Sequence, residues 1–316
     1  MSVSAALASP VFQLYAAMAA GLLIAAGAAL AACRWWCGGL DHAWKAYCGW
    51  LVMVPLLFGA IFLGREATVV FFTVVALLGF KEFARATALD QDWLMTAAVC
   101  LGIVAVGVVA VVPDPTLGVL GWYGLFMALP VFVSAGLLLI PIVRNRTKGQ
   151  LQVLALAIVG FLYFGWMFGH LAFLANAGHA YSYLLYLLFA VEFNDVAAYT
   201  CGKLLGRHAL RCNISPKKTW EGAVAAVALS LALPWLLRDT FPHREARYLL
   251  FIGLIVGIGG QLGDLALSVI KRDLGLKDMG SAIPGHGGIL DRIDSLIYVA
   301  PLFFHVTRYW HDLYTP

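Results

Sequence analysis

The side chains best suited to chemistry in this chain lie between residues 264 and 294. Asp264, Ser268 and Lys271 are spaced i, i+4 and i+7, so on a helix they share one face. That face would present a carboxylate, a hydroxyl and an ammonium group where an apolar segment ends. Because ionisable groups at membrane depth are costly, such a set indicates function. The structural alternative is a proton-relay or packing carboxylate at Asp264 that pairs with Lys271.

A glycine-rich segment follows, and "IPGHGG" at 283–288 cannot form a regular helix. Free backbone N–H groups in such a segment can bind a phosphate. His286 is expected to be exposed in the loop as a phosphate or base contact, with a role as catalytic general base as the less favoured alternative. Asp291 and Asp294, three residues apart, begin the next helix. Paired carboxylates beside a glycine-rich loop predict a Mg²⁺ site. The basic residues that would neutralise phosphate charge are Lys271, Arg272, Lys277 and Arg292.

Residues 192–222 form a second polar stretch, in which Asn194, Asp195 and Tyr199 lie near the end of an apolar segment. Further along, Ser215-Pro216 predicts a helix N-cap followed by proline at the first helical position. The following Lys217 and Lys218 would then lie at the positive end of a helix, where a phosphate binds favourably. The alternative is that these lysines only anchor the chain at the membrane surface.

These motifs resemble the signature of the integral-membrane phosphatidate cytidylyltransferases, also called CDP-diacylglycerol synthases. The matching residues are Ser268, Lys271, Arg272, Lys277, Asp278, Pro284, His286, Gly287, Gly288, Asp291, Arg292 and Asp294. Upstream, Asn194-Asp195-x-x-Ala-Tyr199 and Ser215-Pro216-x-Lys218-Thr219-x-Glu221-Gly222 look like the same family. The motifs fall within residues 192–295, whereas the N-terminal half resembles the family only in being hydrophobic.

The resemblance implies Mg²⁺-dependent transfer of a cytidylyl group from CTP to phosphatidic acid, which releases pyrophosphate and CDP-diacylglycerol. By similarity, Asp264 and Asp291 would be the metal ligands, with a monovalent cation such as K⁺ nearby. Together with the residues above, we expect catalytic roles for Asp264, Ser268, Lys271, Arg272, Asp291 and Asp294. We expect substrate contacts from Asn194, Asp195, Tyr199, Ser215, Lys217, Lys218, Thr219, Lys277, His286, Gly287, Gly288 and Arg292.

Three alternatives to this activity stay open: cytidylyl transfer to another lipid phosphate, phosphorylation of a lipid alcohol, and transport of phosphate-bearing solutes. Transporters tend to show two halves that mirror each other. Here eight of the 17 acidic residues lie between 192 and 294 in or against apolar segments, and this imbalance between the halves counts against transport. We expect membrane lipids as partners and no nucleic acid.

The elements that must position these residues are membrane helices. Only 12% of the residues are charged, against about 25% in soluble proteins, and the mean hydropathy is +0.86. Since a span takes about 20 apolar residues, the sequence predicts an all-α polytopic membrane protein with nine or ten transmembrane helices. The ten candidates are 11–32, 47–64, 66–80, 93–112, 119–143, 151–175, 181–200, 222–237, 248–270 and 293–307.

The chain divides by charge into N-terminal transmembrane helices at 1–180 and a C-terminal catalytic region at 181–316. With ten helices, 16 of the 21 Lys and Arg residues fall on one side of the membrane, which predicts that side as cytoplasmic. The polar loops at 201–221 and 271–292 and the active site would face the cytoplasm, and both termini the other side. We expect a bacterial inner membrane protein.

Three further expectations concern the membrane helices. The first apolar segment is longer than a signal-peptide core and is expected to be retained as a helix. The "KEFARA" segment at 81–86 is interpreted as a helix end at the membrane surface, where Lys81 and Arg85 reach the headgroups. Gly257, Gly259, Gly260 and Gly263 would let helices approach closely, and such an interface permits a homodimer.

Overall fold

The chain is almost entirely helical. A computed structural model describes residues 1–316 except 38–40, 212, 281–286, 312 and 314–316. The helices before the second polar stretch are α1 (Val3–Ala8), α2 (Pro10–Cys37), α3 (Asp41–Leu63), α4 (Arg65–Ala86), η1 (Leu89–Gln91), α5 (Trp93–Val111), α6 (Tyr123–Val143), α7 (Gln150–Gly160), the π-helical turn η2 (Phe161–Met167), α8 (Phe168–Leu174) and α9 (Ala180–Leu205). The remaining elements are β1 (Ala209–Arg211), β2 (Ser215–Thr219), α10 (Trp220–Leu236), η3 (Arg238–Thr240), α11 (Ala246–Asp273) and α12 (Leu290–Trp310).

Each of the ten expected membrane segments lies on a helix, which confirms the all-α class. In the part of the chain that the structure describes, eight helices are long and apolar enough to cross a membrane. The continuous run from Gln150 to Leu174 counts as one of them. Helix α10 is apolar but shorter, and α12 carries Asp291, Arg292, Asp294 and Arg308, which lower its hydropathy.

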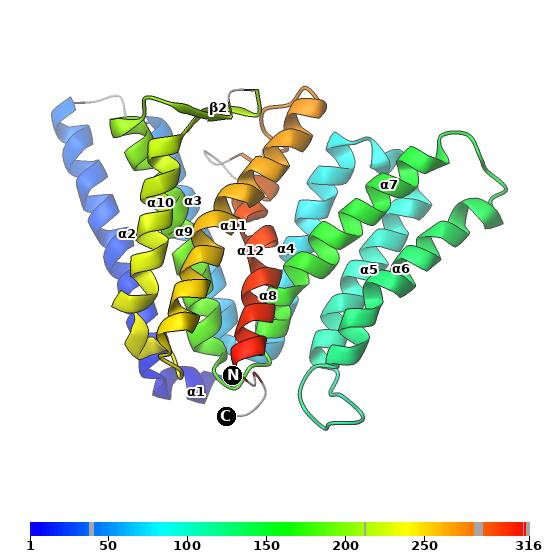
Figure 1. The fold of residues 1–316 in the computed structure, drawn as a ribbon, viewed down its shortest axis with the longest axis horizontal. Coiled ribbons are helices and arrows are strands. Elements are labelled where there is room, and N and C mark those ends of the chain that lie inside the picture. Colours follow the sequence, from blue (N-terminus) through cyan, green and yellow to red (C-terminus); the bar gives the residue numbers. More distant parts are fainter. Residues whose placement is uncertain (38–40, 212, 281–286, 312, 314–316) are drawn as a thin grey trace.

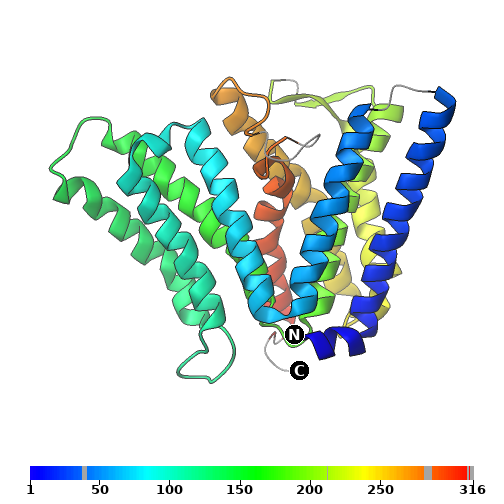
Figure 2. The ribbon, with the colours of Figure 1, turned by 180° about the vertical axis from the view of Figure 1, so that it is seen from behind.

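Helices α9, α10, α11 and α12 pack against one another and form one bundle (Figure 1). Helices α4 and α8 contact α12, and α5, α6 and α7 form a layer beyond them. Helices α2 and α3 lie on the opposite side of the molecule, as the view from behind confirms (Figure 2). Helices from the N-terminal half therefore flank the bundle on two sides.

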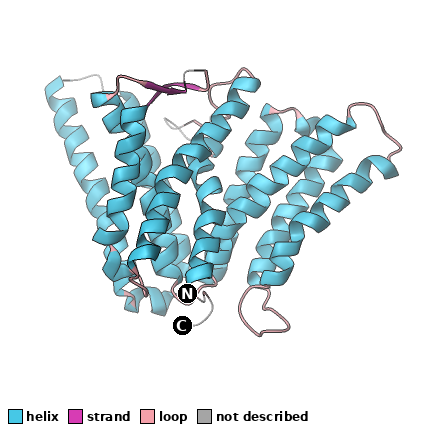
Figure 3. Cartoon of the chain, viewed as in Figure 1, coloured by secondary structure: helices cyan, strands magenta, loops and turns pink. Residues whose placement is uncertain are grey.

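The polar loops and the chain termini lie at opposite ends of the bundle. The only strands in the described residues, β1 and β2, sit at one end, beside the end of α11 (Figure 3). Both termini lie at the other end (Figure 1). This relative placement was predicted from the charges, whereas the side of the membrane that each end faces stays a prediction.

Glycines let the bundle helices approach closely, as the sequence predicted. A Cβ on Gly263 of α11 would lie 2.8 Å from the backbone oxygen of Asp294 and 3.0 Å from Cα of Ser295, both on α12. A Cβ on Gly260 would lie 2.7 Å from Nδ2 of Asn194 on α9. These glycines are used inside one chain, so they offer no surface to a second copy, and the homodimer stays an untested prediction.

The predicted N-cap at Ser215-Pro216 is wrong. Residues 215–219 form β2, which pairs antiparallel with β1, and α10 begins only at Trp220. Thr219 is the N-cap, and its hydroxyl accepts a hydrogen bond from the Gly222 backbone N–H at 3.2 Å. Proline is tolerated here because a two-stranded hairpin leaves N–H groups unpaired at its edge. Lys217 and Lys218 therefore project from opposite faces of a strand rather than from a helix N-terminus.

Candidate active site

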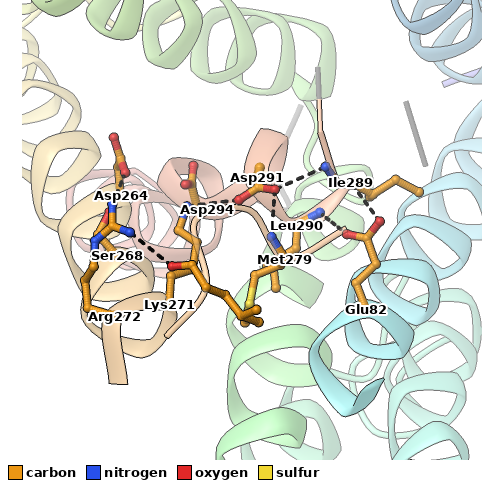
Figure 4. Close-up of polar contacts among 12 residues, drawn as sticks. Glu82, Asp264, Ser268, Lys271, Arg272, Met279, Ile289, Leu290, Asp291 and Asp294 are labelled. Atoms are coloured by element: carbon orange, nitrogen blue, oxygen red, sulfur yellow. Dashed lines mark hydrogen bonds and ion pairs between the residues drawn. The ribbon is translucent and has the colours of Figure 1, made fainter. Parts of the chain in front are cut away.

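Helix α11 presents the predicted face of Asp264, Ser268 and Lys271. The Ser268 hydroxyl donates to Oδ1 of Asp264 at 3.2 Å, one turn apart (Figure 4). The other carboxylate oxygen, Oδ2, is 2.7 Å from Nζ of Lys218 on the β-hairpin. Asp264 therefore pairs with Lys218 from a different element, and the structural alternative of an Asp264–Lys271 pair is wrong.

Lys271 pairs instead with Asp291 at the start of α12. Its Nζ donates to Oδ1 of Asp291 at 2.9 Å, and the two side chains are only 11% and 6% exposed. Oδ2 of Asp291 accepts the backbone N–H groups of Met279 at 3.2 Å and Gly288 at 3.1 Å. Charge-assisted hydrogen bonds of this kind are strong. Asp291 thus connects Lys271 of α11 with the backbone at Met279 and at Gly288.

Two further carboxylates reach the same region from α9 and α12. Oδ2 of Asp195 accepts from the Ser295 hydroxyl at 3.3 Å, and Oδ1 of Asp294 accepts from the Ser295 backbone N–H at 2.7 Å. Asp195, Asp264 and Asp294 are close enough to repel one another electrostatically. A cation bound among these carboxylates would relieve their mutual repulsion.

Asn194 links the cluster of Asp195, Asp264, Asp291 and Asp294 to helix α10. Its Oδ1 accepts from the buried Ser230 hydroxyl of α10 at 3.1 Å, and its Nδ2 donates to Oδ1 of Asp195 at 3.4 Å. Asn194 is fully buried. It therefore fixes the orientation of the Asp195 carboxylate rather than meeting a solvent-borne substrate directly.

The donor atoms fit Mg²⁺, which prefers oxygen ligands and often takes only one or two carboxylates from a protein. Asp264 is the accessible carboxylate, with its side chain 33% exposed, whereas the Asp291 side chain is buried and already accepts three hydrogen bonds. Among the described residues, no group of three or more His, Cys, Asp or Glu side chains is arranged to hold a metal ion. Substrate phosphate and water oxygens would have to complete the coordination.

Arg272 lies beside the cluster but its guanidinium is engaged elsewhere. Its Nε donates to the Ile214 carbonyl at 3.2 Å, and its Nη1 donates to the Leu276 carbonyl at 3.0 Å. Ile214 belongs to the hairpin connection, so Arg272 fastens the hairpin over the end of α11. The structure thus gives this predicted catalytic residue a positioning contact.

The other predicted residues fall into four groups. Ser215 and Thr219 are half-buried on the hairpin, and Gly287 has φ +82°, a left-handed conformation that favours glycine. Four exposed side chains make no hydrogen bond to the carboxylate cluster within the described residues: Tyr199, Lys217, Lys277 and Arg292. His286 lies outside the described residues.

The structure also brings Glu82 to the site, and the sequence analysis did not predict this. Glu82, near the end of α4, accepts the backbone N–H of Ile289 through Oε1 at 3.1 Å and that of Leu290 through Oε2 at 2.9 Å. The interpretation of 81–86 as a helix end at the membrane surface gave Glu82 no role. Its only local signal is an acid between two basic residues, because its partners are more than 200 positions away.

The fold and the site together define a polytopic membrane protein with a charged, oxygen-rich site at one end of its helix bundle. Residues 44–310 match the profile of the Cytidylyltransferase family, so the chain belongs to that family.

Its curated relatives include phosphatidate cytidylyltransferases. The Staphylococcus aureus (strain COL) protein of that name is 31% identical over 253 residues, which cover 80% of this chain and 92% of the relative. The Staphylococcus epidermidis protein of the same name is 36% identical over 160 residues, covering 50% of this chain and 60% of the relative. "Uncharacterized protein YnbB" of Escherichia coli (strain K12) is 44% identical over 126 residues, 40% of this chain, and the match spans only 42% of that relative.

Proposed function

We propose that this protein transfers the cytidylyl group of CTP to phosphatidic acid, forming CDP-diacylglycerol and pyrophosphate in phospholipid biosynthesis. Membership of the Cytidylyltransferase family and the name of the Staphylococcus aureus relative support the reaction class. The observation that carries the proposal is the meeting of the two lysine–aspartate pairs, Lys218–Asp264 and Lys271–Asp291, on one face of α11.

The reaction brings two anions together. A phosphate oxygen of phosphatidic acid attacks the α-phosphorus of CTP, a new P–O bond forms, the bond to the β-phosphate oxygen breaks, and pyrophosphate leaves. Lys218 and Lys271 supply positive charge at fixed positions, and positioned charge is the main source of rate in such transfers. A phosphate monoester is already ionised near neutral pH, so the attacking group needs no strong general base.

The two aspartates fix the positions of the two lysines. Because Asp264 holds Lys218 and Asp291 holds Lys271, the two ammonium groups are oriented before substrate arrives. Mg²⁺, when bound, would neutralise phosphate charge and favour departure of pyrophosphate. Asp264 would hold it through its exposed carboxylate, and Asp291 by resemblance to the family, with a monovalent cation such as K⁺ nearby.

The location of the cluster suits a reaction between a soluble nucleotide and a lipid. It lies at the bundle end that carries the hairpin, where α11 ends and α12 begins (Figure 1). A lipid phosphate at the membrane surface and CTP from water can meet there. We propose that this end faces the cytoplasm of a bacterial inner membrane, because the Lys and Arg excess lies on it.

The test is an assay of the purified protein in lipid–detergent micelles with labelled CTP. Phosphatidic acid is compared with lysophosphatidic acid, an isoprenoid phosphate and diacylglycerol, each with Mg²⁺, with EDTA, and with Mg²⁺ plus K⁺ or Na⁺. We expect pyrophosphate and labelled CDP-diacylglycerol only with phosphatidic acid and Mg²⁺. If the cytidylyl group is transferred to a different lipid phosphate, that lipid is the acceptor in place of phosphatidic acid. If no acceptor gives pyrophosphate release, the proposed function is rejected.

A further inference from the structure

Glu82 brings the N-terminal half of the chain into the candidate active site. It lies on α4, and its carboxylate accepts the backbone N–H groups of Ile289 and Leu290 where α12 begins (Figure 4). The first N–H groups of any helix lack acceptors within the helix. Glu82, from a different helix, supplies acceptors for the N–H groups of Ile289 and Leu290. Its negative charge is also stabilised by the positive N-terminal end of the α12 dipole.

Two glycines allow the Glu82 carboxylate to approach this backbone closely. A Cβ on Gly288 would lie 2.5 Å from Oε2 of Glu82, and a Cβ on Gly280 would collide with Oε1. Gly280 and Gly288 are on either side of the part of the signature that lies outside the described residues. Both can approach one carboxylate only because they lack side chains.

Glu82 and Asp291 hold the same piece of backbone from opposite sides. Asp291 accepts the N–H of Gly288, and Glu82 accepts those of the next two residues. Asp291 also pairs with Lys271. The charged groups of the substrates that bind during catalysis would therefore act on the same carboxylate that holds the Gly288 N–H. Among the described residues, Glu82 makes no hydrogen bond or ion pair with Lys218 or Lys271, so its hydrogen bonds to α12 do not involve either lysine directly.

We propose that Glu82 is a positioning residue for the reaction: it fixes the start of α12 and so sets the places of Asp291 and Asp294 opposite Lys271. This inference rests on the proposed function. It assigns part of the site to α4, a helix that the sequence places outside the catalytic region.

The test compares Glu82→Gln with Glu66→Gln, a control at the other end of α4. Glu66 is 65% exposed and pairs only with its neighbour Arg65 in the described structure. Hydrogen exchange at Ile289 and Leu290 is measured without substrate, and kcat and KM for CTP are measured well below the unfolding temperature. We expect Glu82→Gln to speed exchange at these two amides about tenfold and to lower kcat roughly 10- to 100-fold, with a smaller change in KM.

Glu66→Gln should leave both readouts at wild-type values. Glu82→Asp, whose shorter side chain withdraws the carboxylate from both amides, should reproduce the faster exchange and serves if Glu82→Gln does not fold. Wild-type exchange in Glu82→Gln, or faster exchange with unchanged kcat, would overturn the inference. Failure of the proposed function is distinct, since the wild-type protein itself would then release no pyrophosphate while the exchange result still stands.

Discussion

Lys217 and Lys218 are neighbours with different surroundings. Lys218 lies 2.7 Å from Asp264 and its side chain is 19% exposed, whereas Lys217 projects from the other face of β2 into solvent. A strand reverses its side chains at every residue, so one lysine reaches the site and the next cannot. The pair therefore offers a test of the site with a control of the same residue type.

We expect Lys218→Met to lower kcat/KM for CTP roughly 100-fold, because it removes a fixed positive charge and leaves Asp264 without its partner. Lys217→Met removes the same charge from the hairpin but should stay within about twofold of wild type. Steady-state kinetics of the two purified variants check this. Equal losses in both would mean that the hairpin acts only through its overall charge.

Asp291→Asn replaces one carboxylate oxygen with an N–H₂ group at a residue that accepts three hydrogen bonds. An amide keeps one acceptor oxygen but brings an N–H₂ group against Lys271 or the backbone amides. We expect turnover to fall at least about 100-fold, with the protein still inserted and folded. Pyrophosphate release and size-exclusion chromatography measure the two quantities, and near wild-type turnover would remove Asp291 from the catalytic set.

At the scale of elements, the contact between α11 and α12 decides whether the site can assemble. Gly263→Ala would put a Cβ 2.8 Å from the Asp294 backbone oxygen, where no flexible side chain can give way. We expect it to destabilise the protein by about 1–3 kcal/mol, as overpacking does. Gly59→Ala in α3 has nothing within 4 Å and should change stability by less than about 1 kcal/mol. Thermal unfolding in detergent compares them, and an equal midpoint for both variants would contradict the close packing.

The helices were predictable, but not every contact between them. Long apolar runs fix a membrane helix locally, and the spacing of Asp264, Ser268 and Lys271 fixes their shared face. The hairpin was not predictable, because Ser215 and Thr219 are both good capping residues and pairing with β1 decides between them. Glu82 was beyond reach for a similar reason, since its partners are brought to it only by the packing of α4 near α12.

At the scale of the whole molecule, the bundle has a charged end and an end that carries both termini. The connection between α5 and α6 lies at the latter end (Figure 1), and Leu117 within it is 72% exposed. Leu117 is a better labelling position than Thr116, whose hydroxyl donates to Asp114 and lowers the pKa of that carboxyl. Lys217 is an exposed position at the charged end.

The Lys and Arg excess predicts that the charged end faces the cytoplasm, because basic loops are retained there. In a cysteine-free background that keeps activity, we expect Leu117→Cys to react with a membrane-impermeant maleimide in spheroplasts. Lys217→Cys should react only after the membrane is opened. Since CTP is made and used in the cytoplasm, the reverse pattern would put the lysine–aspartate pairs beyond the reach of the nucleotide and would exclude the proposed reaction in cells.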